Sequence, residues 1–341
     1  MGGMTARWLP ISAAAILSLP SYALSANPQD PPKFRSSVDV VSVSAVVKDR
    51  KGKFVSNLKQ DDFVVSEGTE MKRILDFRAE TDGPVKLGLL MDASGSMRIG
   101  QIAVDARETA QHLFSALRQD DQAALFSFDT RLDRVSPFTS DTATLDAALG
   151  KLNPPYGKTS LYDAIAEAAT FVAQEGRAEG RLPQRSALVV LTDGIDTHSR
   201  STTEQVAAIA SRIDVPVYII AVMSPIDDPR TDETPSFDAT GLQQLARSTG
   251  GEMFIASAPA HASAAARQIV AELRHQYVLA FEASSRPGWR GISVQSRDKK
   301  HTVRARTGYS AGGSSRPTPA TGPGVSLESY AALQAPSCGA L

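Results

Sequence analysis

The chain has 341 residues and nearly balanced charge, with 36 Lys and Arg against 37 Asp and Glu. Its hydrophobic share of 42% and its 24 glycines are typical of globular proteins, which excludes a wholly disordered or collagen-like chain. A net charge of −1 gives no sign of the basic surface that nucleic-acid binding needs, so we expect no nucleic-acid partner. The length suggests two domains of roughly 150 residues each.

Residues 1–25 have the pattern of a secretory signal peptide. Arg7 precedes an apolar run over residues 8–20, and small residues around 23–25 form a cleavage pattern. An N-terminal membrane anchor is the less favoured alternative, because the run falls short of the roughly 20 residues that span a bilayer. We therefore expect the mature chain to have no transmembrane anchor and to be exported, to the periplasm or the extracellular space.

Residues 310–341 are rich in Pro, Gly, Ser and Thr, a composition that predicts a disordered tail. The single cysteine, Cys338, lies in this tail, so we expect no intramolecular disulfide bond in the fold. We interpret Cys338 as an idle thiol. Attachment of the tail, or pairing with another molecule, is the alternative.

Short strand patterns occur in two separate parts of the chain. Alternating polar and apolar residues, broken by turns containing Gly and Asp, mark residues 36–82, and the alternation returns over residues 276–309. Neither set has enough strands to bury a face alone. We predict that the two sets form one antiparallel β-sandwich with the intervening residues inserted into it. Two separate small β units are the alternative.

Residues 85–275 predict a doubly wound α/β domain with a mostly parallel sheet. Four near-continuous apolar runs are typical of parallel strands covered on both faces: VKLGLLMDAS (85–94), QAALFSFDT (122–130), RSALVVLTDG (185–194) and VPVYIIAVMS (215–224). Amphipathic helical patterns lie between and after these runs, at about 100–118, 141–152, 161–175, 202–213, 238–248 and 259–275.

Side chains with oxygen atoms follow two of these strands. Asp92, Ser94 and Ser96 occupy alternate positions where the first strand ends, and Asp193 follows a later strand. Thr159 comes just before a predicted helix. Doubly wound sheets bind ligands at the carboxyl ends of their strands, where the strand order reverses. If the two strands flank that reversal, these side chains converge in one crevice.

The donors of this set are two carboxylates and three hydroxyls, with no His or Cys inside the motifs. Such hard oxygen donors exclude a zinc-type site and favour Mg²⁺ or Mn²⁺. Hydroxyl ligands supply less negative charge than a full set of carboxylates, so the ion stays electrophilic. We expect it to accept the carboxylate of an Asp or Glu of a partner protein as its last ligand. The pattern predicts a binding site with no evident means of catalysis.

Local structural roles are the alternative interpretation of the same residue types. Asp and Ser at a strand-to-helix junction are often helix caps. Ser160 and Asp163 have the spacing of a capping box, which predicts a structural role for Ser160 and leaves Thr159 free to bind metal. Asp129 follows another strand and could reach the site, but we favour a role in a turn.

Three enzymatic alternatives lack residues that they need. His198 could serve a Ser-His-Asp hydrolase with Ser94 or Ser96, but the G-x-S-x-G turn that presents such a nucleophile is absent there. Phosphoryl transfer with Asp92 as nucleophile would want a second carboxylate at the position of Ser94. A dinucleotide site needs G-x-G-x-x-G after the first strand, and DASGSM does not supply it. Of these, hydrolysis stays as a minor alternative.

The DxSxS motif at 92–96, the Thr before a helix and TDG at 192–194 resemble the metal-ion-dependent adhesion site of von Willebrand factor A domains. The resemblance covers roughly residues 85–275 and implies the sheet order 3-2-1-4-5-6. The flanking segments DFVVSEG…ILDF and LRHQYVLAFE…VRARTGY resemble secreted bacterial proteins related to these domains, of the acidobacterial type.

By this resemblance, the hydroxyls of Ser94, Ser96 and Thr159 contact the metal directly, and Asp92 and Asp193 act largely through bound water. The implied function is an exported adhesion or interaction module that captures an acidic residue of an unidentified protein. A structural scaffold is the alternative, in which the metal only stabilises the fold and the sandwich or the tail does the binding.

Overall fold

The computed structural model describes residues 40–81, 83–98, 101–152, 156–177, 185–223 and 238–311. The predicted signal peptide and residues 312–341 of the predicted tail, with Cys338, lie outside these described residues. The first two residues of the predicted tail, Ser310 and Ala311, are not disordered but end a strand. Within the described ranges, no helix is both long enough and apolar enough to cross a membrane.

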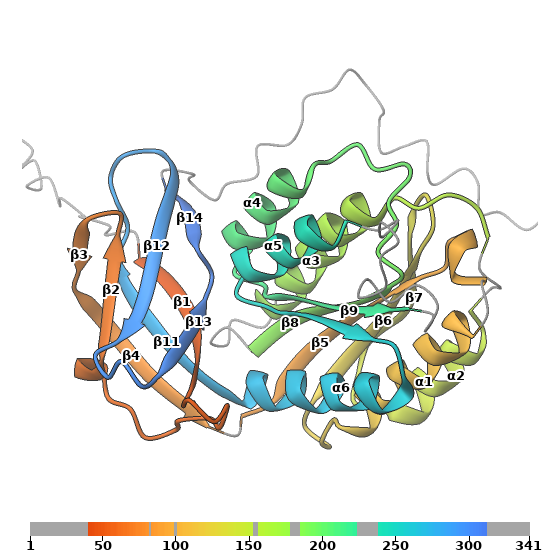
Figure 1. Ribbon diagram of the computed structural model, residues 1–341, viewed down its shortest axis with the longest axis horizontal. Coiled ribbons are helices and arrows are strands. Elements are labelled where there is room, and N and C mark those ends of the chain that lie inside the picture. Colours follow the sequence, from red (N-terminus) through yellow and green to blue (C-terminus); the bar gives the residue numbers. More distant parts are fainter. Residues whose placement is uncertain are drawn as a thin grey trace, which may run out of the picture. The chain divides into compact units, whose positions relative to one another are not determined.

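A six-stranded sheet forms the centre of the α/β region, in the order β10-β9-β8-β5-β6-β7 (Figure 1). The strands are β5 (Val85–Asp92), β6 (Gln122–Phe128), β7 (Leu132–Thr139), β8 (Arg185–Thr192), β9 (Val217–Val222) and β10 (Met253–Ala256). All neighbours pair in parallel except β6 and β7. If β5 is numbered as strand 1 and β10 as strand 6, the sheet read from β7 to β10 has the order 3-2-1-4-5-6. The doubly wound, mostly parallel sheet is confirmed.

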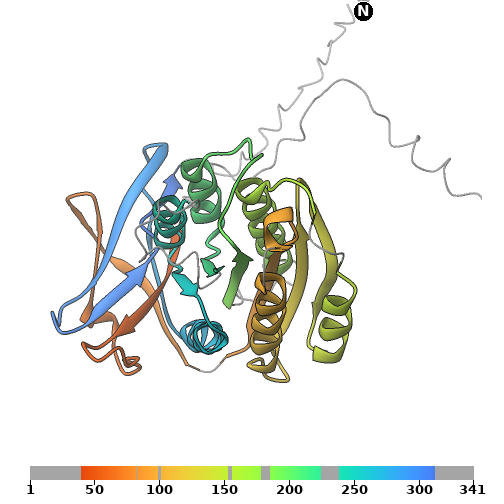
Figure 2. The same ribbon diagram turned by 45° about the vertical axis from the view of Figure 1, so that its right-hand side comes forward.

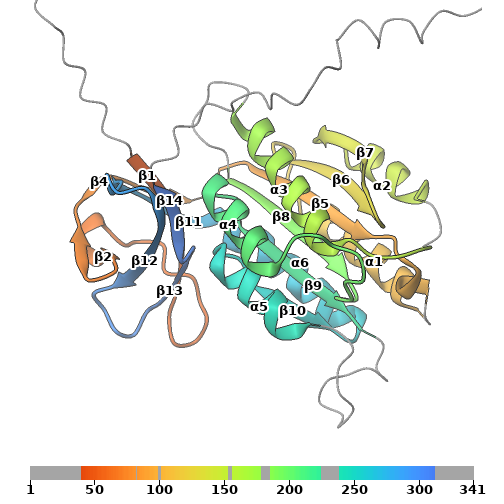
Figure 3. The same cartoon turned by 90° about the horizontal axis from the view of Figure 1, so that it is seen from above.

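Helices cover both faces of this sheet and bury one apolar core on each. One face carries α1 (Ile102–Ser115), α2 (Thr142–Gly150) and α6 (Pro259–Arg274). The other carries α3 (Leu161–Arg177), α4 (Thr203–Ile213) and α5 (Ala239–Ser248). Figure 3 shows α3 and α4 lying over their face of the sheet. All six helices fall where the sequence pattern predicts them.

The two edge strands, β7 and β10, were not predicted from the sequence. Strand β7 is mostly exposed or half-buried and contains Pro137, which lacks the N–H group of a regular sheet strand. Strand β10 has four residues and one fully buried side chain, Ala256. An edge strand buries less apolar surface than a central one, so neither strand produces a continuous apolar run.

Strands from both ends of the described chain build two small antiparallel sheets. One sheet has the order β13-β1-β11-β4, and the other β14-β12-β2-β3. The strands are β1 (Val40–Lys48), β2 (Phe63–Glu67), β3 (Glu70–Lys72), β4 (Ile74–Thr81), β11 (His275–Glu282), β12 (Gly288–Ser296), β13 (Thr302–Ala305) and β14 (Gly308–Ala311). A short 3-10 helix, η1 (Gln60–Asp62), precedes β2.

The two sheets share one apolar core, with Phe63, Tyr277, Phe281 and Tyr309 among its members. Strand β11 lies between β1 and β4, so early and late strands alternate within one sheet. Figures 1 and 2 show the early strands (orange) and the late strands (blue) side by side. The prediction that both sets form one sandwich is therefore confirmed, and the alternative of two separate β units is wrong.

Candidate metal centre

The carboxyl end of β5 is the point at which the order of the central sheet reverses. After β5, the chain adds β6 and β7 on one side and then β8, β9 and β10 on the other. Asp92 is the last residue of β5, and Asp193 directly follows β8, its neighbour. Both carboxylates thus stand at the place where doubly wound sheets bind ligands.

Asp92 is buried and firmly held. Its Oδ1 accepts the backbone N–H of Ser94 at 2.8 Å, and its Oδ2 accepts the hydroxyl of Thr192 at 2.6 Å. The Thr192 hydroxyl in turn accepts the backbone N–H of Gly194 at 2.9 Å, so the ends of β5 and β8 are joined through one hydroxyl. These contacts fix the orientation of the Asp92 carboxylate.

The two serines lie beside the carboxylates. Ser94 is fully buried and Ser96 is half-buried at the start of a short 3-10 helix, η2 (Gly95–Arg98). Their Oγ atoms are 3.1 Å apart. The Ser94 hydroxyl lies near enough to Asp92, and the Ser96 hydroxyl to Asp193, to favour the ionised form of each carboxyl and so act to lower its pKa. The structure therefore brings four of the five predicted ligands into one cluster.

Thr159 is buried, and the loop just before it is bonded to the segment that carries Ser94. The N–H of Gly95 donates to the carbonyl oxygen of Gly157 at 3.0 Å, and that of Tyr156 donates to Ala93 at 2.8 Å. A Cβ at Gly95 would stand 3.0 Å from the Gly157 oxygen, so glycine permits this close approach. The Thr159 loop is thereby packed against the segment that carries Ser94.

The predicted capping box at the start of α3 is not formed. The N–H of Ser160 donates to the carbonyl oxygen of Asp129, and the Asp163 carboxylate accepts the N–H groups of Arg200 and Ser201. The first amides of α3 instead donate to Asp196 and Ser199. The predicted turn role of Asp129 agrees with the structure, since its carboxylate accepts the N–H groups of the next two residues.

Burial raises the pKa of Asp92 to about 7, against hydrogen bonds from Ser94 and Thr192 that lower it, and the Asp193 charge raises it further. Burial also raises the pKa of Asp193. Among the described residues, no Lys, Arg or His forms an ion pair with either carboxylate. Two buried acids without a basic partner among the described residues, beside the Ser94 and Ser96 hydroxyls, fit a divalent cation that prefers oxygen ligands.

In the described part of the chain, no cluster of three or more His, Cys, Asp or Glu side chains is placed to hold a metal. The five predicted ligands include two carboxylates, and their remaining donors are hydroxyls, so they form a different kind of donor set. Their role in binding metal stays a prediction.

Two threonines that support the cluster were not predicted as site residues: Thr192, which the sequence shows only as part of the TDG motif, and Thr197. Thr192 is the last residue of β8 and bonds Asp92, while Thr197 bonds the backbone of Thr159. The pairing of Met91 with Leu191 places the next residues, Asp92 and Thr192, opposite each other. Once the register of β5 and β8 is known, the role of Thr192 follows from the sequence.

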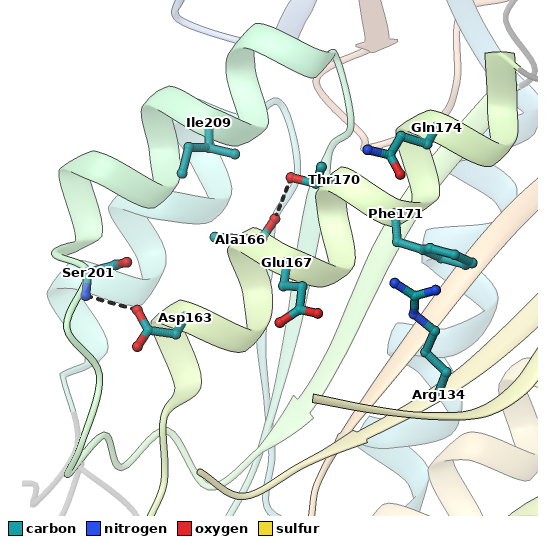
Figure 4. A pocket seen from close by; sticks show the side chains of 9 residues that line it. All are labelled: Arg134, Asp163, Ala166, Glu167, Thr170, Phe171, Gln174, Ser201 and Ile209. Atoms are coloured by element: carbon teal, nitrogen blue, oxygen red, sulfur yellow. Dashed lines mark hydrogen bonds between the residues drawn. The ribbon is translucent and has the colours of Figure 1, made fainter. Parts of the chain in front are cut away.

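A shallow groove of about 420 Å³ lies on the outer side of α3, apart from the Asp92 cluster. Figure 4 shows its lining side chains, among them Asp163 and Glu167 on α3 and Arg134 on β7. The Arg134 guanidinium stacks 4.2 Å above the centre of the Phe171 ring. The Asp163 carboxylate that borders the groove is already bonded to the loop after β8.

A model of the von Willebrand factor type A domain family matches residues 87–195. The matched residues make up about a third of the chain, and all five predicted ligands lie within them. Domains of this family are typically adhesion or protein-interaction modules and generally lack catalytic activity. The comparison with curated proteins gives no match.

Several solved structures are distantly similar. BatB, a conserved hypothetical protein of Bacteroides thetaiotaomicron, is 19% identical with a TM-score of 0.45, over 55% of this chain and 98% of its own. A von Willebrand factor type A protein of Catenulispora acidiphila is 12% identical with a TM-score of 0.46, over 82% and 76%. Proximal thread matrix protein 1 of the mussel byssus is 14% identical with a TM-score of 0.45, over 57% and 49%.

Proposed function

We propose that the α/β region is a divalent-cation-dependent module that binds a protein partner. In this proposal Asp92, Ser94, Ser96, Thr159 and Asp193 hold Mg²⁺ or Mn²⁺. An Asp or Glu carboxylate of the partner completes the coordination of the ion. We also propose that the module acts outside the cytoplasm, and N-terminal sequencing of the exported protein should then place its start near residue 26.

The observation that carries the proposal is the burial of Asp92 and Asp193 at the carboxyl edge of the sheet, where neither forms an ion pair with a basic side chain of the described residues. Removing two carboxylates from water costs several kcal/mol each by general estimates, unless a cation compensates them. One divalent ion neutralises both. Since the other three donors are neutral hydroxyls, the loaded site carries no net negative charge and can attract a further carboxylate.

Access from solvent supports a partner as the last ligand. Ser96 is half-buried, and the loop residues Tyr156, Gly157 and Lys158 before Thr159 are exposed, with Tyr156 at 76%. A partner residue can therefore approach the cluster from the side of this loop. A hydrolytic role has less support, because His198 is exposed and its ring has no hydrogen bond to Ser94 or Ser96 among the described residues.

The second candidate function is a scaffold whose ion is structural. The burial of Asp92, Ser94, Thr159 and Asp193 favours it, since a deeply enclosed ion has few positions left for an outside ligand. The two functions differ in whether the bound ion keeps an exchangeable position.

Titration of the chain with Mn²⁺ by calorimetry tests the metal itself. We expect one ion per chain in the wild type and loss of binding in Asp193→Asn. Asp141→Asn is the matched control, because Asp141 caps α2 and its side chain bonds residues of its own turn. Absence of Mn²⁺ and Mg²⁺ binding by the wild type would overturn the proposal.

Relaxation of water protons by the bound Mn²⁺ then separates the two functions. An open position holds exchanging water, and a peptide containing Asp or Glu should displace that water and lower the relaxation rate. The same peptide with Asn or Gln in place of the acid is the control. If the acidic peptide leaves the relaxation rate of the water protons unchanged, the scaffold function is favoured.

A further inference from the structure

Both backbone groups of Thr159 are held by the segment that follows β8. The N–H of Thr159 donates to the Thr197 hydroxyl at 3.0 Å. The carbonyl oxygen of Thr159 accepts the N–H groups of Thr197 at 3.0 Å and His198 at 2.8 Å. The position of this residue is therefore set by a segment almost forty residues further along the chain.

The same segment caps α3, the helix that begins two residues after Thr159. The first N–H groups of a helix lack partners within the helix. Here the N–H of Leu161 donates to Asp196 Oδ1 at 2.8 Å, and that of Tyr162 donates to Ser199 Oγ at 3.0 Å. The Ser199 hydroxyl donates to the same Asp196 oxygen at 2.6 Å, which joins the two capping groups.

Asp193 lies at the beginning of this segment, so one stretch of backbone carries one predicted ligand and holds another. The Asp193 carboxylate accepts the N–H of Ile195 at 3.1 Å, and the contacts to Thr159 and α3 follow within the next four residues. Loss of the contacts between this segment and Thr159 or α3 would thus change the spacing between the Asp193 carboxylate and the Thr159 hydroxyl.

We propose that Asp196, Thr197 and Ser199 are positioning residues of the metal centre, which fix the Thr159 hydroxyl relative to Asp193. This inference rests on the proposed function. None of the three needs to touch the ion. Groups that orient metal ligands typically change metal affinity by about 10-fold to 100-fold when they are removed.

A pair of matched variants tests the proposal. Asp196→Ala removes the carboxylate that caps α3, and Asp141→Ala removes an Asp that caps α2 by an equivalent bond to a backbone N–H. Both should lower the melting temperature modestly, because both lose a helix cap. Only Asp196→Ala should weaken Mn²⁺ binding, by about 10-fold. Asp196→Asn keeps an oxygen acceptor for Leu161 and should restore most of the affinity.

A second readout needs no metal. Hydrogen exchange of the metal-free protein should show faster exchange at the Leu161 amide in Asp196→Ala, and at the Thr159 amide in Thr197→Val. Thr197→Ser keeps the hydroxyl and should restore protection. The two Thr197 variants also keep the proposal testable if Asp196→Ala does not fold.

The outcomes separate the two proposals. Unchanged Mn²⁺ affinity in both Asp196→Ala and Thr197→Val, with wild-type binding intact, would overturn the positioning role alone. A wild type that binds no Mn²⁺ would overturn the proposed function. In that case faster exchange at Thr159 would still support the positioning of this residue, and unchanged exchange would contradict it.

Discussion

Two groups of buried carboxylates in the described part of the chain have their charges compensated differently. Where α6 meets the sandwich, Glu272 is fully buried. Its Oε1 accepts hydrogen bonds from Lys48 Nζ at 2.7 Å and Gln268 Nε2 at 3.0 Å, and its carboxylate forms an ion pair with Arg304. Burial raises the pKa of Glu272, but the charge of Arg304 and these contacts outweigh it and hold the pKa below its usual value.

At the carboxyl edge of the sheet, the buried Asp92 and Asp193 have hydroxyl and backbone partners and no basic side chain among the described residues. Burial there raises the pKa of Asp92 to about 7. The contrast assigns Glu272 a structural role and leaves Asp92 and Asp193 as candidates for a functional one. A buried charge that the chain itself compensates fixes the position of α6, whereas a buried charge left uncompensated fits an ion from outside.

Breaking the junction cluster should give the largest effect. Arg304→Ala leaves the buried Glu272 and its neighbour Glu252 without the guanidinium that bridges them. Removing one partner of a buried ion pair costs about 3 kcal/mol or more. We expect such a loss in the free energy of unfolding, measured by urea denaturation, and the same Mn²⁺ affinity as the wild type. A loss of affinity with an unchanged stability would contradict the assignment of this cluster to architecture.

The equivalent change at the metal centre should have the opposite sign. In metal-free protein, Asp92→Asn removes a buried charge and keeps an oxygen acceptor for the Ser94 N–H, and its NH2 group would donate to the Thr192 hydroxyl in place of accepting from it. We expect the free energy of unfolding to rise by about 1 kcal/mol. Mn²⁺ binding should be lost. Destabilisation of the metal-free protein by this variant would show that Asp92 is a structural group.

The layered fold could be predicted from the sequence because burial on both faces leaves a continuous apolar pattern. Strands β5 and β9 are entirely buried, and each lies within an apolar run that the sequence displays. The edge strands β7 and β10 are not covered in this way, and no such run marks them. Pairing of β1 with β11 joins residues more than two hundred positions apart, and the sequence supported it through the argument that neither strand set could bury a face alone.

The candidate site likewise has one part that the sequence predicted and another that it did not. The rule that ligands bind at strand ends was sufficient to group Asp92 with Asp193. The contacts that hold Thr159 and the start of α3 were not predictable from local spacing. Ser160 and Asp163 have the sequence of a capping box, but they bond to residues outside α3. Asp196 and Ser199 cap α3 from 35 and 37 residues away. Tertiary contacts replaced a local motif, and nothing near α3 in the sequence signals that replacement.

The smallest expected effect concerns the groove on α3, a third region, where the cation is exposed. Arg134 lies over the Phe171 ring without an ion pair among the described residues (Figure 4). An exposed cation on an aromatic ring contributes about 0.5 kcal/mol. Arg134→Ala should therefore change the urea midpoint slightly and leave Mn²⁺ affinity unaltered. If it weakened Mn²⁺ binding, the groove would be coupled to the metal centre through the Asp163 contacts with Arg200 and Ser201, and the division between the regions would fail there.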